Sequence, residues 1–496
     1  MNGTQAIPID VLQATTLDTS DRRSLTVMTV KRRALADRRK AAGHTQEQLA
    51  ALLEVERSTV VRWEAGETAP QPWCRAKLAK ALAVSLDVLH ELLAEPADLQ
   101  RHPGDALLLV SSPGGLTSKQ VGALMERFSA MDIASRRDVL QKLTIMSGTV
   151  LLQPVHRWLA QALADVPLVS PESVSSDALD ALERALTLFR QWDASGVGGL
   201  HRKAVAGQLN AVAETLHESS TSPQMSRRLF HIMAELAQLA GWMAYDQDLP
   251  GVAQRYYLLA LSACQEARAP ALGAKIIGDM AHLSTRYHRY EDSLDISRTA
   301  LYILPRYDSA LVRTELLGVE STAHARLGNQ AAATRAAEAC VEVWQEARSE
   351  VAPGWQSYMN QAEVDCLAAN TYINLALRTE DNKRVSTHAE RAEQHVLSAR
   401  ASRAHNYVRS RIFDEIRIAK VRLAQRDVVE SVTVAQTALE LAAPTSSILV
   451  CDSLIRFHGE LTARYPHNTH ITPFSEQLRE FVKRAAPHKE REVTAT

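Results

Sequence analysis

The residues most able to do chemistry lie in one short segment, residues 43–66. A helix is expected over residues 57–64, with Val60 and Trp63 facing inward. The side chains left on its outer face are Arg57, Ser58, Val61 and Arg62. The forked N–H donors of arginine match the paired N7 and O6 acceptors of guanine. The outer face therefore has the donors needed to contact nucleic-acid bases.

A second helix is expected directly before this one and would position it. Thr45 can cap that helix, and Gln48 stands three residues later, at the partner position of a capping box. Its inner face would consist of Leu49, Ala50 and Leu53. Residues 54–56 form the turn between the helices, with Val55 in the core, and Gly66 permits the second helix to stop.

The charge distribution singles out the same part of the chain. Residues 28–80 contain eleven Lys or Arg and six Asp or Glu, a net charge of +5, whereas the whole chain has a net charge of −1. The remainder is therefore acidic. A small basic module on an acidic body suits phosphate binding by one end only.

Length and composition narrow the protein class. At 496 residues, the chain is expected to form two or three domains, and 46% hydrophobic with 23% charged residues is typical of a soluble protein. No apolar run reaches the ~18–20 residues of a membrane span. The five cysteines are odd in number and show no metal-ligand spacing, which indicates reduced thiols in a cytoplasmic protein. No metal site is expected.

The order of polar, basic and helix-periodic stretches predicts six regions. Residues 1–27 read as a flexible arm, although translation could also start at Met28. A helix-turn-helix module follows over 28–95 and a linker rich in Pro and Gly over 96–117. The remaining regions are a helical connecting or dimerising region (118–230), a repeat region (231–484) and a flexible tail (485–496).

A weak internal repeat has a spacing of about forty residues. The segments 239–245, 280–286 and 320–326 share small residues, and each is followed by a second helix with small residues at regular places. Small residues are needed where two antiparallel helices approach closely. The register resembles the tetratricopeptide pattern, although its period exceeds the usual 34 residues.

The first module resembles the phage-repressor and Cro family of helix-turn-helix domains. The resemblance rests on Thr-Gln-x-x-Leu-Ala, then Val-x-x-Ser-Thr-Val-x-x-Trp-Glu-x-Gly and a later Leu-Ala-x-Ala-Leu-x-Val. It implies five helices and a dimer on double-stranded DNA. Arg57, Ser58 and Arg62 would then read bases, and Lys40, Gln46 and Thr59 would contact the DNA backbone.

One position departs from the family pattern. Glu56 stands where Ser or Thr usually caps the recognition helix. A carboxylate favours the positive end of a helix, but it would also lie near phosphates and could contact cytosine amino groups.

The alternative function is a protein-protein adaptor whose first domain no longer reads DNA.

The helical body resembles a bacterial group that pairs a repressor-like domain with tetratricopeptide-like repeats. The resemblance rests on residues 188–199 and 235–257, and it implies a regulator of development or secondary metabolism. In that register, an effector groove for a peptide, protein or small molecule would be lined by Glu235, Gln238, Trp242, Tyr245, Lys275, His282, Arg286, Thr322 and Arg326. Equally, Trp242 and Tyr245 could be plain core residues.

Motifs of catalysis are missing from the sequence. It contains no G-x-S-x-G, P-loop, H-E-x-x-H or glycine-rich dinucleotide turn, so neither an enzyme nor a cofactor is expected.

The predicted fold is all-α, with an N-terminal five-helix repressor-like helix-turn-helix domain followed by an α-solenoid of tetratricopeptide-like helix pairs. The predicted function is sequence-specific transcriptional regulation.

Overall fold

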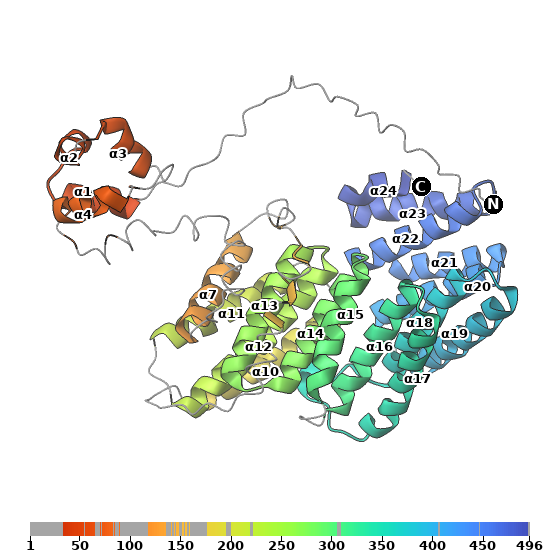
Figure 1. Ribbon diagram of the computed structural model, residues 1–496. Helices are drawn as coiled ribbons and strands as arrows, with labels where there is room; N and C mark the ends of the chain where they lie inside the picture. Colours follow the sequence, from red (N-terminus) through yellow and green to blue (C-terminus); the bar gives the residue numbers. More distant parts are fainter. Residues whose placement is uncertain are drawn as a thin grey trace, which may run out of the picture. The chain divides into compact units, whose positions relative to one another are not determined.

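The computed structural model describes residues 33–53, 55–64, 72–82, 118–134, 176–194, 200–218, 222–304, 309–404, 407–445 and 447–494, with some isolated positions between 70 and 158. The chain divides into two compact units, residues 1–101 and 102–496. All regular elements among the described residues are helices, which confirms the all-α prediction (Figure 1). The expected arm at 1–27 and linker at 96–117 lie outside the described residues.

Four helices make up the described part of the first unit. They are α1 (Arg33–Ala41), α2 (Gln46–Leu53), α3 (Arg57–Glu64) and α4 (Pro72–Ala81). The predicted fifth helix falls mostly outside the described residues, although Leu89 is helical and buried. The apolar core includes Leu35, Leu49, Ala50, Leu53, Val60, Trp63, Cys74, Leu78, Leu82 and Leu89. Both helices of the predicted motif therefore turn their expected faces inward.

A buried carboxylate joins the first three helices. Glu64, in α3, accepts a hydrogen bond from Arg39 Nε of α1 at 2.5 Å and one from Gln46 Nε2 of α2 at 2.7 Å. The side chains of Arg39 and Glu64 are only 8% and 9% exposed. Burying a charge is costly unless it is paired and hydrogen-bonded, and here both conditions are met.

The second unit begins with three helices, α7 (Ser118–Ala134), α10 (Ser176–Ala194) and α11 (Leu200–Glu218). Helices α7 and α11 pack against each other, and α7 also contacts α13. Asp132 of α7 forms a buried ion pair with Arg202 of α11 and accepts a hydrogen bond from Tyr256 Oη at 2.8 Å. These contacts join the connecting helices to the helix pairs that follow.

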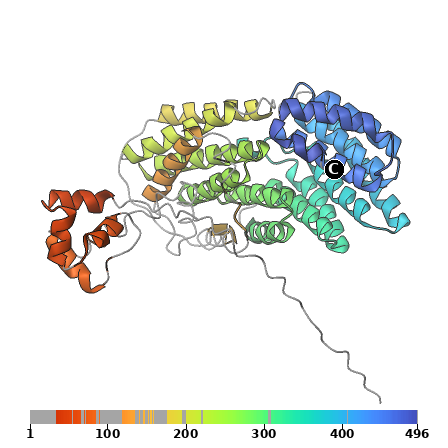
Figure 2. The same cartoon turned by 90° about the horizontal axis from the view of Figure 1, so that it is seen from above.

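Helix pairs form the rest of the second unit (Figure 1 and Figure 2). The first helix of each pair packs against the second, and most second helices also contact the following pair. The pairs are α12 (Pro223–Asp246) with α13 (Pro250–Ala267), α14 (Pro270–Arg286) with α15 (Tyr290–Ile303), α16 (Ala310–Arg326) with α17 (Gln330–Ala347), α18 (Gln361–Arg378) with α19 (Asn382–Ser402), α20 (Val408–Ala424) with α21 (Val428–Ala442), and α22 (Ile448–Arg464) with α23 (Ile471–Ala485).

The first helices of successive pairs contact one another. Helices α12, α14, α16, α18, α20 and α22 thus form a continuous layer, called the inner layer below, and α22 also contacts α12. The short helix η3 (Gly354–Gln356) lies between the third and fourth pairs, and η4 (Pro487–Lys489) and α24 (Glu490–Thr494) follow the last. The array extends beyond the predicted repeat region of 231–484 at both ends.

Proline sets the start of several helices. Pro223, Pro250 and Pro270 each stand in the first turn of α12, α13 and α14, where a missing N–H costs nothing and the fixed φ suits a helix. Proline at these three positions therefore marks where a helix begins.

Equivalent contacts recur along the pairs. Ser293 Oγ donates to the carbonyl of Ala281 at 3.0 Å, and Ser431 Oγ donates to the carbonyl of Ala419 at 2.8 Å. Both bonds span twelve residues and join the two helices of one pair. Gly241 has the ring of Tyr257 against it, and a Cβ there would lie 2.6 Å from Tyr257 Cε1. Small residues thus occur where paired helices approach closely, as the repeat predicted.

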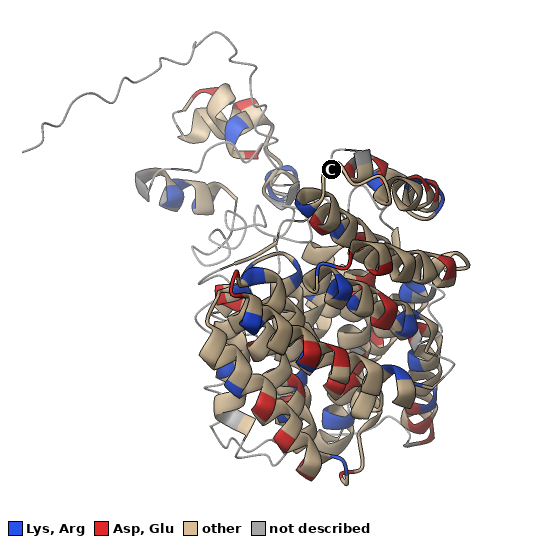
Figure 3. Cartoon of the chain, turned by 90° about the vertical axis from the view of Figure 1, so that its right-hand side faces the viewer, with Lys and Arg blue, Asp and Glu red and all other residues tan. Residues whose placement is uncertain are grey.

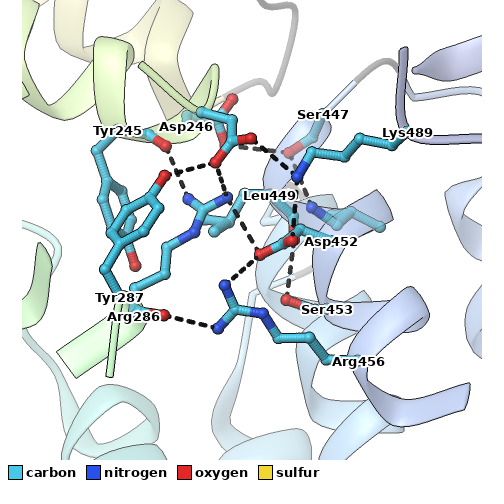
Figure 4. Close-up of polar contacts among 12 residues, drawn as sticks. Tyr245, Asp246, Arg286, Tyr287, Ser447, Leu449, Asp452, Ser453, Arg456 and Lys489 are labelled. Carbon is cyan, nitrogen blue, oxygen red and sulfur yellow. Dashed lines mark hydrogen bonds and ion pairs between the residues drawn. The ribbon is translucent and has the colours of Figure 1, made fainter. Parts of the chain in front are cut away.

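Charged side chains join the first pairs to the last one (Figure 4). Arg286 of α14 contacts Asp248 and Asp452 at 3.3 Å each, and Lys489 contacts the same two acids at 2.8 and 3.2 Å. Arg456 of α22 contacts Asp452 and donates to the carbonyl of Arg286. One polar network therefore joins the first helix pairs to the last one.

The C-terminal segment takes part in this network. Residues 485–496 were expected to be a frayed tail, yet Lys489 is buried and α24 packs against α22 and α23. The difference arises because Lys489 finds two acidic partners that lie far from it in sequence. A charge-rich composition cannot reveal such long-range partners.

Other sequence expectations concern cysteines, metals and membranes. All five cysteines are buried and free, as predicted for reduced thiols. Within the described ranges, no group of His, Cys, Asp and Glu has the arrangement of a metal site. None of the helices that the structure describes is long and apolar enough to cross a membrane.

The buried pair in the first unit yields a stability prediction. We expect Glu64→Gln to destabilise helices α1–α3 by roughly 3 kcal/mol, because Arg39 would stay buried without a countercharge. This corresponds to about a hundredfold increase in the opening equilibrium. Hydrogen exchange of peptides covering residues 33–64 in the full chain measures it.

A matched control is available in the same unit. Glu47→Gln also removes one acid that is paired with an arginine, but the Arg57–Glu47 pair is exposed. We expect only a small loss of stability from this change, because exposed ion pairs contribute little. Equal protection of residues 33–64 from hydrogen exchange in the Glu64→Gln and Glu47→Gln variants would contradict the role assigned to Glu64.

The polar network in the second unit yields a pH prediction. Burial alone would raise the pKa of Asp248, but hydrogen bonds from Lys489 and Tyr287 and the charge of Arg286 lower it to about 2. A carboxyl whose pKa is lower in the folded state stabilises the fold above its unfolded pKa, and this contribution is lost as the pH falls through the folded pKa. Asp248 should therefore contribute about 1 kcal/mol less at pH 3 than at pH 7.

Asp248→Asn should remove this pH-dependent contribution. Asparagine also tolerates the positive φ of 58° at position 248, so the backbone can stay unchanged. Urea unfolding followed by circular dichroism at pH 7 and pH 3 measures the difference, with the exposed Asp295→Asn as control. The same acid sensitivity in wild type and Asp248→Asn would contradict the prediction.

Candidate functional site

Helix α3 separates into an inner and an outer face as predicted. Val60 and Trp63 are buried, while Arg57, Ser58, Val61 and Arg62 are exposed. Thr59 is half-buried at the side of the helix. Since α3 is only eight residues long, its orientation depends on the two inward side chains and on Glu64 at its end. The three residues predicted to read bases thus share one accessible face.

The start of α2 has the capping geometry expected from the sequence. Thr45 Oγ1 accepts from the backbone N–H of Gln48 at 3.1 Å, and Gln48 Oε1 accepts from the backbone N–H of Thr45 at 2.8 Å. These reciprocal bonds satisfy two backbone donors that the helix itself leaves unpaired. The predicted capping box is confirmed.

Arg57 has one ion-pair partner among the residues that the structure describes. Its Nε lies 2.6 Å from Glu47 Oε1, and the two side chains are 62% and 59% exposed. The backbone amide at the start of α2 lowers the pKa of Glu47, and the Thr45 hydroxyl and Arg57 contribute further. An exposed pair of this kind contributes little stability, so a phosphate or a guanine could replace Glu47 as the partner of Arg57.

Ser58 and Arg62 also have local hydrogen bonds. Ser58 Oγ donates to Glu56 Oε2 at 3.1 Å, which leaves the hydroxyl oxygen able to accept from an amino group. Arg62 Nε donates to the Ser58 carbonyl at 3.3 Å within the helix, so its terminal N–H groups extend from the exposed face. Glu56 thereby orients Ser58 and brings a negative charge to the same face.

The basic cluster of residues 31–40 is not uniform. Arg39 is buried against Glu64, and Arg38 Nε donates to the carbonyl of Leu82 at 2.9 Å, whereas Lys40 is exposed. Gln46 is half-buried and uses one amide N–H on Glu64. Its second N–H is available in principle, since a primary amide has two. Sequence reasoning treated Arg39 as a surface cation and missed its internal role.

The nine residues predicted to line an effector groove all lie on the inner layer, on α12, α14 and α16. Several contact partners within the chain. Glu235 pairs with Arg190 at 2.6 Å, Gln238 donates to Asp279 at 2.7 Å, and Thr322 lies 3.4 Å from Thr371.

The aromatic residues among these nine also have contacts within the helical unit. The rings of Trp242 and Tyr245 stack with centroids 5.1 Å apart, and the guanidinium of Arg286 lies 4.8 Å from the Tyr245 ring centroid. Arg286 Nη1 also donates to the Tyr245 carbonyl at 2.7 Å. These side chains therefore pack against one another, in line with the alternative interpretation as core residues.

A buried charge network surrounds Lys275. Its Nζ lies 2.5 Å from Asp279 and 3.4 Å from Glu315, and the side chain is 2% exposed. Burial would lower the pKa of Lys275, but the two carboxylates raise it. Glu315 also accepts from Tyr358 and Gln356, and His282 lies 4.0 Å away. Lys275 thus stabilises the fold between α14 and α16.

Sequence reasoning missed the acids that hold this layer together. Asp279 stands four residues after Lys275, an i,i+4 spacing that could have signalled the pair. Glu315 and Asp452 come from other helices and had no such signal. Elsewhere on the helical unit, Lys and Arg are interspersed with Asp and Glu without a large single-sign region (Figure 3).

Comparison with known families supports the helix-turn-helix interpretation of the first unit. A family model described as helix-turn-helix, HTH_3, matches residues 35–89, which include α2, the turn and α3. No curated protein matches the chain. No tetratricopeptide domain is identified in the helical region, so that resemblance stays a prediction. The match indicates a DNA-binding transcriptional regulator with an N-terminal helix-turn-helix domain followed by a helical region.

Proposed function

We propose that this protein is a sequence-specific regulator that places α3 in the major groove of double-stranded DNA. The observation that carries the proposal is the accessible face of α3, where two arginines and a serine lie side by side on a helix held by a buried core. Arg57 and Arg62 would each contact a guanine through paired N–H donors. Ser58 would accept from an adenine or cytosine amino group.

Three further residues would contact the DNA backbone. Lys40 is exposed near the end of α1, Gln46 starts α2, and Thr59 lies at the side of α3. Such contacts fix the position of the domain without reading sequence. The second amide N–H of Gln46 would bind a phosphate while Glu64 holds the first, so that Glu64 would set the geometry of this contact.

The helical unit would serve dimerisation and effector sensing. By resemblance to repressors, a dimer would bind two half-sites about one helical turn, ~10 base pairs, apart or a multiple of this. An effector bound to the inner layer would change how the two first domains are spaced, provided that it favours one of two states. By the resemblance of the body, such control would act in development or secondary metabolism, and the free, buried cysteines suit a cytoplasmic protein.

The accessible face of α3 leads to a binding prediction. Sites selected from a random duplex library by the wild type should contain guanines opposite Arg57 and Arg62. We expect Arg57→Ala with Arg62→Ala to weaken binding to a selected duplex by ~1–3 kcal/mol for each lost base contact. Binding to a scrambled duplex should fall much less. Fluorescence anisotropy with both duplexes measures this.

A second double variant separates base reading from charge. Lys77→Ala with Lys80→Ala removes the same charge from exposed positions on α4. It should weaken both duplexes alike, because it changes only the sequence-independent attraction to phosphates. If the Arg57 and Arg62 double variant keeps the wild-type ratio of specific to non-specific affinity, these two residues do not read bases. A wild type that binds the selected and the scrambled duplex equally would be better explained as an adaptor that does not read DNA.

Glu56 leads to a salt-dependent prediction. Glu56→Gln should raise the affinity for a scrambled duplex by about threefold at low salt, because a negative charge near the phosphates is removed. The gain should shrink at high salt, where the repulsion is screened. Anisotropy titrations at two salt concentrations test this, and an unchanged affinity at both would place Glu56 away from the DNA.

A further inference from the structure

Four helices of the inner layer end in an arginine. Arg286 ends α14, Arg326 ends α16, Arg378 ends α18 and Arg464 ends α22. A cation at the C-terminus of a helix is favourable by itself, because the helix dipole places negative charge there. The arginines differ, however, in what else they contact.

Two of the four have partners within the chain. Arg286 contacts Asp248, Asp452 and the carbonyl of Tyr245. Arg464 donates to the carbonyl of Leu377. By contrast, neither Arg326 nor Arg378 forms a hydrogen bond or an ion pair with any residue that the structure describes. Arg326 is half-buried and Arg378 is exposed, so both remain within reach of a ligand.

Two more cations of the inner layer belong to the same edge, because α22 reaches the ends of α14 and α18 through hydrogen bonds from Arg456 and Arg464 to the carbonyls of Arg286 and Leu377. Lys420 of α20 contacts Glu460 at 3.2 Å, and Arg456 of α22 contacts Asp452 at 2.9 Å (Figure 4 shows Arg456). Asp452 is already shared with Arg286 and Lys489. Glu460, the partner of Lys420, also acts on Arg326.

The charges of these side chains act on one another. Burial lowers the pKa of Arg326; Tyr290 and Glu460 oppose this shift, and the positive charges of Arg378 and Arg456 add to it. Burial also lowers the pKa of Lys420, which Glu460 opposes and to which the charges of Arg326 and Arg456 add. Four cations from four helices therefore meet in a partly desolvated place where one another's charge is felt. Glu460 and Asp452 neutralise part of this positive charge, and the excess would attract a further anion.

We propose that Arg326, Arg378, Lys420 and Arg456 form a binding site for a small anion that carries a phosphate or carboxylate group. Guanidinium groups match either group with paired hydrogen bonds, and a half-buried site strengthens them. The cations come from α16, α18, α20 and α22, so a bound anion would join four pairs of the array. Only the regulatory meaning of this site rests on the proposed function, because the binding itself needs no DNA.

Calorimetric titration of the full-length protein tests the site. The probes are pyrophosphate and citrate, each added to protein in a chloride buffer of constant ionic strength, which distinguishes phosphate from carboxylate. The wild type should bind at least one probe saturably. Arg326→Ala with Arg378→Ala should weaken that binding at least tenfold, since both unpartnered guanidinium groups are removed.

A matched control removes two exposed arginines, one in α17 and one directly after it, Arg335→Ala with Arg348→Ala. It should bind the probe within about twofold of the wild type, because the net charge changes equally but the site stays intact. The single Arg378→Ala variant, at an exposed position, should still bind several-fold more weakly if the double variant fails to fold. Circular dichroism reports folding.

Two results would overturn the site. One is that the wild type binds neither probe saturably. The other is that both double variants lose affinity equally, which would show general charge attraction only. Neither result bears on DNA reading, since the variants of Arg57 and Arg62 test that separately. Conversely, saturable anion binding together with unspecific DNA binding would keep this site and remove the regulatory proposal.

Discussion

The carboxylate of Glu64 is the contact on which the proposed DNA-reading surface depends. It lies at the end of α3 and is held by Arg39 from α1 and by Gln46 from α2. A buried charge requires these partners, so the three helices cannot shift independently without leaving it unpaired. Together with Val60 and Trp63, this contact determines which face of an eight-residue helix is turned outward.

The second unit follows the same physical rule at a larger scale. Charges buried in the inner layer have partners from other helices, as Lys275 has in Asp279 and Glu315. The polar network around Asp452 connects the first pairs of the array with the last one. Against this background of paired charges, Arg326 and Arg378 form no hydrogen bond or ion pair with the residues that the structure describes, and a ligand would complete their hydrogen bonding.

Much of the first unit could be predicted because its determinants are local. The capping box of Thr45 and Gln48 and the inward Val60 and Trp63 follow from spacings of three or four residues. Proline marked helix starts in the second unit for the same reason. Arg39 was misjudged, because its partner stands 25 residues away and a basic run looks the same whether or not one member is buried.

By itself, the sequence determined the all-α class, the helix-turn-helix and the pairing of helices, since these depend on helical periodicity, capping and small residues at fixed intervals. Only the tertiary structure decided which charges are internal. Glu315, Asp452 and Lys489 acquire their roles from helices that lie far apart in the chain, and Arg326 and Arg378 stand out only once every neighbour is known. Ion pairing depends on distance in space, which a single sequence does not encode locally.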